Sequence, residues 1–162
     1  MVLMIEIPFT EEDIAESEFY AIAQIVDCID NDRIGKGGFR NDCESDIESR
    51  IERSTVGILG EIALAKYLNV SSNHAKIGYV TNADLWNWKD HYGIEVKVAR
   101  RILQSYNTVR RDSNKNSIVA ILWYNEPSKK LFFVGVSHTN RIRTDNRLYQ
   151  EDIFEVLEGE PD

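Results

Sequence analysis

The sequence predicts an α+β (or α/β) fold in which a run of β-strands packs against helices. Apolar residues recur at helical spacing twice in the first part of the chain, over residues 10–32 and 45–68. Five short strand-like runs follow between residues 75 and 137. Helices followed by a run of strands are typical of this layered architecture. The 162 residues are enough for one domain with a single substantial core.

Residues 10–32 carry the signals of a helix start and of an amphipathic helix. Thr10 is a candidate N-cap, and the acids Glu11, Glu12 and Asp13 follow it in the first turn, where the helix dipole favours negative charge. The run GKGG at 35–38 ends the helix in a turn and lacks the GK[ST] of a phosphate-binding loop. The apolar residues of this helix are Ile14, Phe19, Ile22, Ile25, Val26 and Ile29.

A second helix is predicted from about Ser45 to about Leu68. The run SDIE offers a capping box in which Glu48 is the partner of Ser45. One apolar stripe at helical spacing follows, and we expect it to be the buried face. The residues of this stripe are Ile47, Ile51, Ile58, Ile62 and Ala65.

The strands are predicted from runs of apolar and β-branched residues between turn signals. WKDHYG predicts a hairpin turn between the second and third strands, and NEPSKK predicts one between the fourth and fifth. Residues 100–116 form a basic connection between the third and fourth strands. The predicted strands are 75–80, 84–88, 93–99, 117–124 and 131–137.

Several functional classes are disfavoured by composition. No apolar run approaches the roughly 20 residues of a membrane span, and the first residues lack the basic region of a secretion signal. Cys28 and Cys43 form no disulfide or zinc pattern, and the three histidines are scattered. We therefore expect a cytoplasmic protein without a zinc site and without a membrane partner.

Charge is distributed unevenly along the chain, although the net charge is −8. Residues 1–52 contain 14 acids and 4 bases, residues 53–150 contain 7 acids and 15 bases, and residues 151–162 contain 6 acids and no base. A basic centre between acidic ends is compatible with a polyanion that touches only the centre. The alternative is a mixture of solvated faces.

Three charged residues in this basic centre form a candidate catalytic set. Glu95 and Lys97 alternate with apolar residues on the predicted strand 93–99, so both side chains lie on the same face. Asp84 begins the preceding strand, across a hairpin from Glu95. Two such carboxylates suit a hard divalent cation, which takes oxygen ligands. The alternative is a solvated strand face on which Glu95 and Lys97 are ordinary cross-strand decoration.

Asp84 followed by Glu95-Val96-Lys97 on an apolar strand resembles the signature of the PD-(D/E)XK nuclease superfamily. The resemblance implies the restriction-endonuclease-like fold, a mixed sheet flanked by helices. It covers roughly residues 45–135. It implies one nuclease-like domain over 1–162, made of an N-terminal helix and loop (1–44), a core with the active site (45–137) and an extension with an acidic tail (138–162).

The resemblance also implies residue roles. Asp84 and Glu95 bind Mg²⁺, for which Mn²⁺ substitutes, and the main-chain carbonyl of Val96 is a further ligand. Many such nucleases have an acidic residue on the helix before the sheet, and Glu61 matches it. Lys97 acts on the attacking water. At about 100° per residue, Glu61 lies about 60° from the centre of the isoleucine stripe, and Gly57 leaves room beside it.

The activity implied by the resemblance is Mg²⁺-dependent hydrolysis of DNA that leaves a 5′-phosphate and a 3′-hydroxyl. Asn82 and Ala83 precede Asp84 where the motif has a proline, and the Gln-x-x-x-Tyr motif of an exonuclease branch is absent, which favours an endonuclease. One chain has one site, so cutting both strands of duplex or branched DNA implies a homodimer or higher oligomer. Expected phosphate contacts are Arg100, Arg101, Arg110, Arg111, Lys115, Arg141, Arg143 and Arg147.

A second hypothesis is non-catalytic. The acidic excess at both ends is compatible with a protein of phage or mobile-element origin that binds another protein, either on an inactive nuclease fold or as a DNA mimic. The intact set of Asp84, Glu95 and Lys97 argues against an inactive site.

Overall fold

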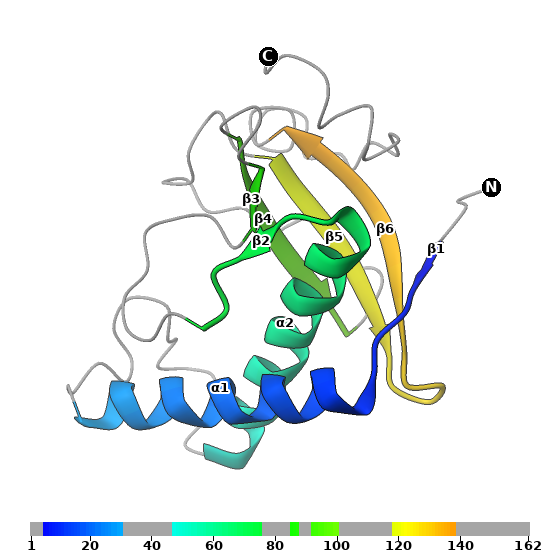
Figure 1. Ribbon diagram of the computed structural model, residues 1–162. Helices are drawn as coiled ribbons and strands as arrows, with labels where there is room; N and C mark the ends of the chain where they lie inside the picture. Colours follow the sequence, from blue (N-terminus) through cyan, green and yellow to red (C-terminus); the bar gives the residue numbers. More distant parts are fainter. Residues whose placement is uncertain (1–4, 31–46, 76–84, 88–91, 101–117, 139–162) are drawn as a thin grey trace.

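The computed structural model describes residues 5–30, 47–75, 85–87, 92–100 and 118–138 (Figure 1). Two helices and a six-stranded sheet are formed by these residues. The elements are β1 (Ile5–Ile7), α1 (Glu11–Asp30), α2 (Ile47–Leu68), β2 (Ser71–Ser72), β3 (Leu85–Asn87), β4 (Tyr92–Ala99), β5 (Ile118–Asn125) and β6 (Lys130–His138).

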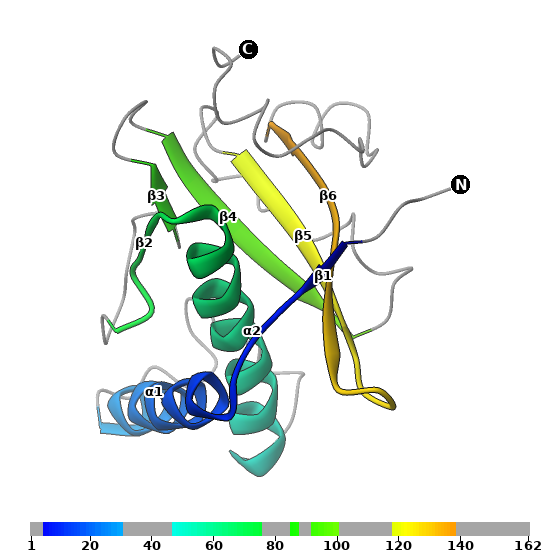
Figure 2. The same ribbon diagram turned by 45° about the vertical axis from the view of Figure 1, so that its right-hand side comes forward.

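The sheet is mixed, which confirms the predicted α+β class. Its strand order is β1-β6-β5-β4-β3-β2; β4 and β5 are parallel, and all other neighbouring strands are antiparallel. α2 packs against the sheet and α1 crosses α2, so both described helices lie on the same side (Figures 1 and 2). The parallel pair β4–β5 needs the long connection that the sequence places at 100–116.

Most predicted elements are confirmed within the described ranges. Both helices, the antiparallel pairing of β3 with β4, and the tight turn between β5 and β6 agree with the prediction. The sequence did not predict β1 and β2, because two or three residues are too few to show alternation. Residues 76–80 of the predicted strand 75–80, the GKGG loop, the turn at 88–91 and the tail beyond residue 138 lie outside the described residues, and Ala75 is in a turn.

Local hydrogen bonds fix the start of α1 and the end of α2. Thr10 and Asp13 cap α1 reciprocally: the Asp13 amide donates to Thr10 Oγ1 at 3.1 Å, and the Thr10 amide donates to Asp13 Oδ2 at 2.9 Å. α2 ends at Leu68 because Asn69 adopts a left-handed backbone with φ of 56°. The amides of Asn69 and Val70 then donate to the carbonyls of Lys66 and Ala65, which is a Schellman motif.

α1 buries a different side from the one that its apolar residues predict. Among the six apolar residues that predict the helix, Ile25 alone is buried, and Phe19 is 65% exposed. The buried side is narrower and more polar, because α1 packs on α2 and not directly on the sheet. Its buried residues are Asp13, Ser17, Ala21, Ile25 and Cys28.

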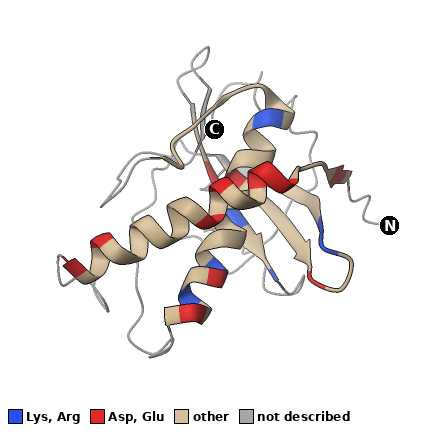
Figure 3. Ribbon diagram, turned by 60° about the horizontal axis from the view of Figure 1, so that its bottom comes forward, with Lys and Arg blue, Asp and Glu red and all other residues tan. Residues whose placement is uncertain are grey.

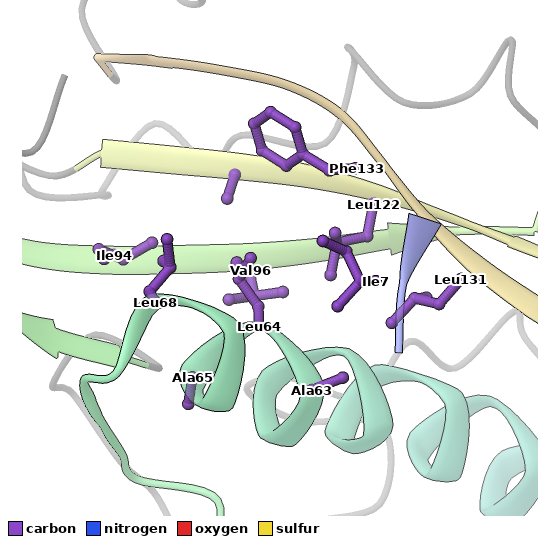
Figure 4. Close-up of a cluster of buried hydrophobic side chains, with 11 residues drawn as sticks. Ile7, Ala63, Leu64, Ala65, Leu68, Ile94, Val96, Leu122, Leu131 and Phe133 are labelled. Carbon is purple, nitrogen blue, oxygen red and sulfur yellow. The ribbon is translucent and has the colours of Figure 1, made fainter. Parts of the chain in front are cut away.

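α2 buries two stripes, and the isoleucine stripe is not the one that faces the sheet. Ile58 and Ile62 form a cluster with Ala21 of α1, against which Ile51 packs, whereas Ile47 is exposed. The main core lies between α2 and the sheet (Figure 4). Its buried residues are Ile7, Ala63, Leu64, Ala65, Leu68, Ile94, Val96, Ala120, Leu122, Leu131 and Phe133.

Gly60 allows α2 to approach the sheet closely. A Cβ at this position would lie 2.3 Å from Val98 Cγ2, closer than packed atoms approach, and 3.2 Å from Leu122 Cδ1, which is a tight contact. The glycine therefore places the axis of α2 against β4 and β5, and this contact fixes which face of β4 is covered by the helix.

Candidate active site on strand β4

The two faces of β4 differ chemically. Ile94 and Val96 are buried in the core beneath α2 (Figure 4). Val98 packs against the same cluster. Because side chains alternate along a strand, Glu95 and Lys97 lie on the opposite face, away from α2. Both are half-buried. The sequence prediction that Glu95 and Lys97 share one face of a strand is confirmed.

The face that carries Glu95 and Lys97 also contains a buried apolar patch. In the parallel register with β5, Glu95 is paired with Val119 and Lys97 with Ile121, so these four side chains lie on one face. Val119 and Ile121 have no exposed surface, and Val134 of β6 joins them at 5% exposure. The two charges therefore border apolar surface that is shielded from water, unlike a fully solvated strand face.

Asp84 lies outside the described residues, but the strand that it precedes is described. β3 and β4 are antiparallel, with Leu85 opposite Ile94 and Trp86 opposite Gly93. Asp84 is the residue before Leu85 in the sequence, and Glu95 is the residue after Ile94.

Glu61 is on α2, which covers one face of the sheet, whereas Glu95 lies on the opposite face. Glu61 is half-buried on α2. At about 100° per residue, it lies about 60° from the stripe that faces α1 and about 60° from the stripe through Gly60, Leu64 and Leu68 that faces the sheet. A Cβ at Gly57 would meet no atom within 4 Å, which confirms the room predicted there. The described structure does not bring Glu61 and Glu95 to one face.

A cation site would need further ligands besides the carboxylates of Glu61 and Glu95. Among the described residues, no group of three or more histidine, cysteine, aspartate or glutamate side chains is placed to hold a metal ion. Oxygen donors such as Glu95 suit Mg²⁺, which commonly binds through one or two carboxylates together with water and phosphate. Glu95 therefore fits a Mg²⁺ site as one carboxylate ligand, and Asp84 is the predicted second ligand.

Arg100 is engaged in ion pairs with two carboxylates. Its Nη2 lies 2.9 Å from Glu52 Oε1 of α2, and its Nε lies 2.8 Å from Glu126 Oε1 in the turn between β5 and β6. The Arg100 side chain is 32% exposed. A phosphate would have to compete with both carboxylates for this guanidinium. The other expected phosphate contacts, Arg101, Arg110, Arg111, Lys115, Arg141, Arg143 and Arg147, lie outside the described residues.

An ion pair that the sequence did not reveal joins α1 to α2, between a buried carboxylate and an exposed lysine. The Asp13 side chain is 3% exposed and accepts a hydrogen bond from Lys66 Nζ. Burial alone would raise the pKa of Asp13, but the hydrogen bonds from Lys66 and Thr10 lower it below its usual value. The bond to Asp13 also raises the pKa of Lys66. This carboxylate is structural, since it caps α1 and joins the two helices.

A polar chain also connects α1 to the segment after α2. His74 Nε2 lies 2.9 Å from Glu16 Oε1, and His74 Nδ1 lies 2.8 Å from Ser72 Oγ. The ring of Tyr20 meets the His74 ring edge to face, with centroids 5.3 Å apart. The partners in the Lys66–Asp13 and His74–Glu16 contacts are 53 and 58 positions apart, so local spacing carries no signal for them.

Comparison with protein families, with curated proteins and with solved structures gives no match to this chain. Among the described ranges, neither helix combines the length and the apolar character that crossing a bilayer requires.

Proposed function

We propose that this protein is a metal-dependent DNA endonuclease of the PD-(D/E)XK type with a restriction-endonuclease-like fold. The observation that carries the proposal is the position of Glu95 and Lys97 on one face of β4, beside a strand that begins directly after Asp84. If the antiparallel register of β3 and β4 continues by one residue, Asp84 is opposite Glu95 and on the same face.

The carboxylates of Asp84 and Glu95 would hold Mg²⁺ or Mn²⁺ together with the carbonyl of Val96. When bound, the cation supplies a Lewis acid that polarises the scissile phosphate and favours ionisation of water. Glu61 would assist only if its side chain reaches round the edge of the sheet, because it starts from the opposite layer. Asp84 and Glu95 are therefore the principal ligands of the proposed site.

Lys97 would orient the attacking water and stabilise the negative charge that develops on the phosphate. Its neighbours Val119 and Ile121 are fully buried. A positive charge next to shielded apolar surface interacts more strongly with an anion than one in bulk water. Its half-buried position therefore supports a role in transition-state stabilisation.

DNA would be held near β4 by the basic residues that follow it. Arg101, Arg110, Arg111, Lys115, Arg141 and Arg143 remain the proposed contacts, and such contacts to phosphates give affinity without reading sequence. Arg100 would contribute only after it leaves Glu52 and Glu126. Cutting both strands of a duplex would need two copies of the chain, and a DNA substrate is consistent with a cytoplasmic protein.

The second candidate is the non-catalytic acidic protein that binds another protein. Two observations favour it: Glu61 and Glu95 lie on different layers, and α1 presents seven acids with no base. On this hypothesis the Glu-x-Lys pair is part of the packing of β4 and holds no cation.

Cleavage of supercoiled plasmid, branched DNA and linear duplex with Mg²⁺ or Mn²⁺ tests the proposal. We expect wild type to cut at least one substrate, EDTA to stop cutting, and Lys97→Ala and Asp84→Ala each to lower the rate at least about 100-fold. Lys130→Ala is the control, since Lys130 is exposed on β6 and pairs only at 3.4 Å with Glu6.

Glu61→Gln resolves the role of the third carboxylate. A loss equal to that of Asp84→Ala would place Glu61 among the ligands, whereas a loss below about tenfold would confine the site to β3 and β4. A folded wild type that binds no Mn²⁺ by calorimetry and cuts none of the three substrates would refute the nuclease proposal and favour the protein-binding candidate.

A further inference from the structure

The outward side of α1 carries an apolar stripe that is not packed against the described core. We name Ala15, Phe19, Ile22, Val26 and Ile29 the outer stripe. Phe19 is 65% exposed, and Ile22, Val26 and Ile29 are between 42% and 49% exposed. The stripe points about 140° away from the side that packs on α2, at 3.6 residues per turn. Exposed apolar surface of this kind marks an interaction site.

The spacing of the outer stripe suits another helix. Its members are separated by four, three, four and three residues, which is the alternation of a helix–helix seam. At 1.5 Å per residue, the stripe is about 21 Å long, or about four turns. Contacts at such positions are how an amphipathic helix is recognised by a complementary surface.

The charges around the outer stripe determine which kind of helix fits. α1 contains seven acids and no base over its 20 residues, and Figure 3 shows the acids distributed along it. Glu11 and Glu18 flank one side of the stripe, and Glu12 and Asp30 flank the other; all four are exposed. A second copy of α1 would bring these acids against one another, whereas basic residues beside an apolar seam would complement them.

We propose that the outer stripe of α1 binds a basic amphipathic helix of a partner protein. The proposal goes beyond the nuclease function and does not depend on it. The outer stripe lies on the side of α1 that faces away from α2, and the Glu95 and Lys97 face of β4 also points away from α2, on the other side of the sheet. A partner on α1 therefore leaves the proposed catalytic face uncovered.

Binding of synthetic peptides to the full 162-residue chain tests the proposal. The probe is a labelled peptide of three heptads with leucine at the two seam positions and lysine at the flanking positions. Two controls are a peptide of the same composition in scrambled order and a peptide with glutamate in place of lysine. We expect the lysine peptide to bind at least about tenfold more tightly than either control, which corresponds to about 1.4 kcal/mol.

Variants then locate the site. Phe19→Ser with Val26→Ser should weaken binding of the lysine peptide at least tenfold. Glu18→Gln with Asp30→Asn should weaken it less and should reduce its dependence on salt. Ile47→Ser is the matched control, because Ile47 is 46% exposed on α2, outside the outer stripe, and its binding should be unchanged. Circular dichroism of each variant establishes that the fold is retained.

Four results would overturn the proposal. These are no binding of the lysine peptide, equal binding of the scrambled peptide, binding that Phe19→Ser with Val26→Ser does not weaken, and a wild-type homodimer that the same double substitution converts to monomer. The last result would assign the outer stripe to a second copy of the chain.

Discussion

The two helices are similar in length, 20 residues in α1 and 22 in α2, but they bury very different surfaces. α2 has ten buried residues and lies between the sheet and α1, whereas α1 has five and touches mainly α2. The larger side chains of α1 point outward, whereas α2 makes a close contact with the sheet at Gly60. The position of a helix in the layers therefore decides how strongly its side chains affect stability.

The largest expected difference between the helices is at their apolar side chains. Leu64→Ala on α2 removes a fully buried side chain from the main core and should lower the free energy of unfolding by about 3 kcal/mol. Ile22→Ala on α1 removes a side chain that is 42% exposed and should lower it by less than about 1 kcal/mol. Urea unfolding of both variants measures the difference. Similar losses would mean that the outer stripe is covered within the chain itself.

The close approach of α2 to the sheet should be sensitive to a single methyl group. Gly60→Ala places a Cβ against Val98 and Leu122 and should destabilise the protein by about 2 kcal/mol, because overpacking forces the core apart. The expected cost exceeds the gain in helix propensity of at most about 1 kcal/mol. A thermal melt that shows no loss would mean that α2 can move away from β4 without cost.

The junction between the helices should be weakened by acid. Since the folded pKa of Asp13 is lowered, its contribution is present above the unfolded value, near pH 3.9, and is lost as the pH falls through the folded pKa. Asp13→Asn should cost about 1 kcal/mol at pH 7 through the weakened cap and lost ion pair. Urea unfolding at several pH values should show the difference between variant and wild type shrink below that range. A difference independent of pH would exclude the ionised carboxylate as its source.

The smallest expected effect has the opposite sign. Gly57→Ala lies one turn before Gly60 on the sheet-facing side, but its Cβ would meet no atom within 4 Å. The substitution should therefore stabilise the protein by about 0.5 to 1 kcal/mol through helix propensity. Urea titration of both variants measures this. A higher midpoint for Gly57→Ala together with a lower midpoint for Gly60→Ala would distinguish the effect of contact with the sheet from the effect of helix propensity. A loss at Gly57 would indicate that the space beside Glu61 is occupied.

The local features that the sequence predicted are those that depend on neighbouring residues. The Thr10 cap, the end of α2 near Leu68 and the alternation of Glu95 and Lys97 with buried residues of β4 agree with the structure. Each follows from spacing and from local backbone chemistry. The sequence did not predict β1, because its three residues form a strand only by pairing with β6, more than 120 positions away.

The features of the candidate site also divide into those that local sequence determines and those that tertiary packing determines. The sequence by itself determined that Glu95 and Lys97 share a face, because alternation is a property of any strand. Only the tertiary structure decided that this face points away from α2, that Glu61 starts from the other layer and that Arg100 is paired with Glu52 and Glu126. The physical reason is that periodicity fixes which side chains share a face but not what covers that face. Packing settled that choice, through the close contact of Gly60 with Val98 and Leu122.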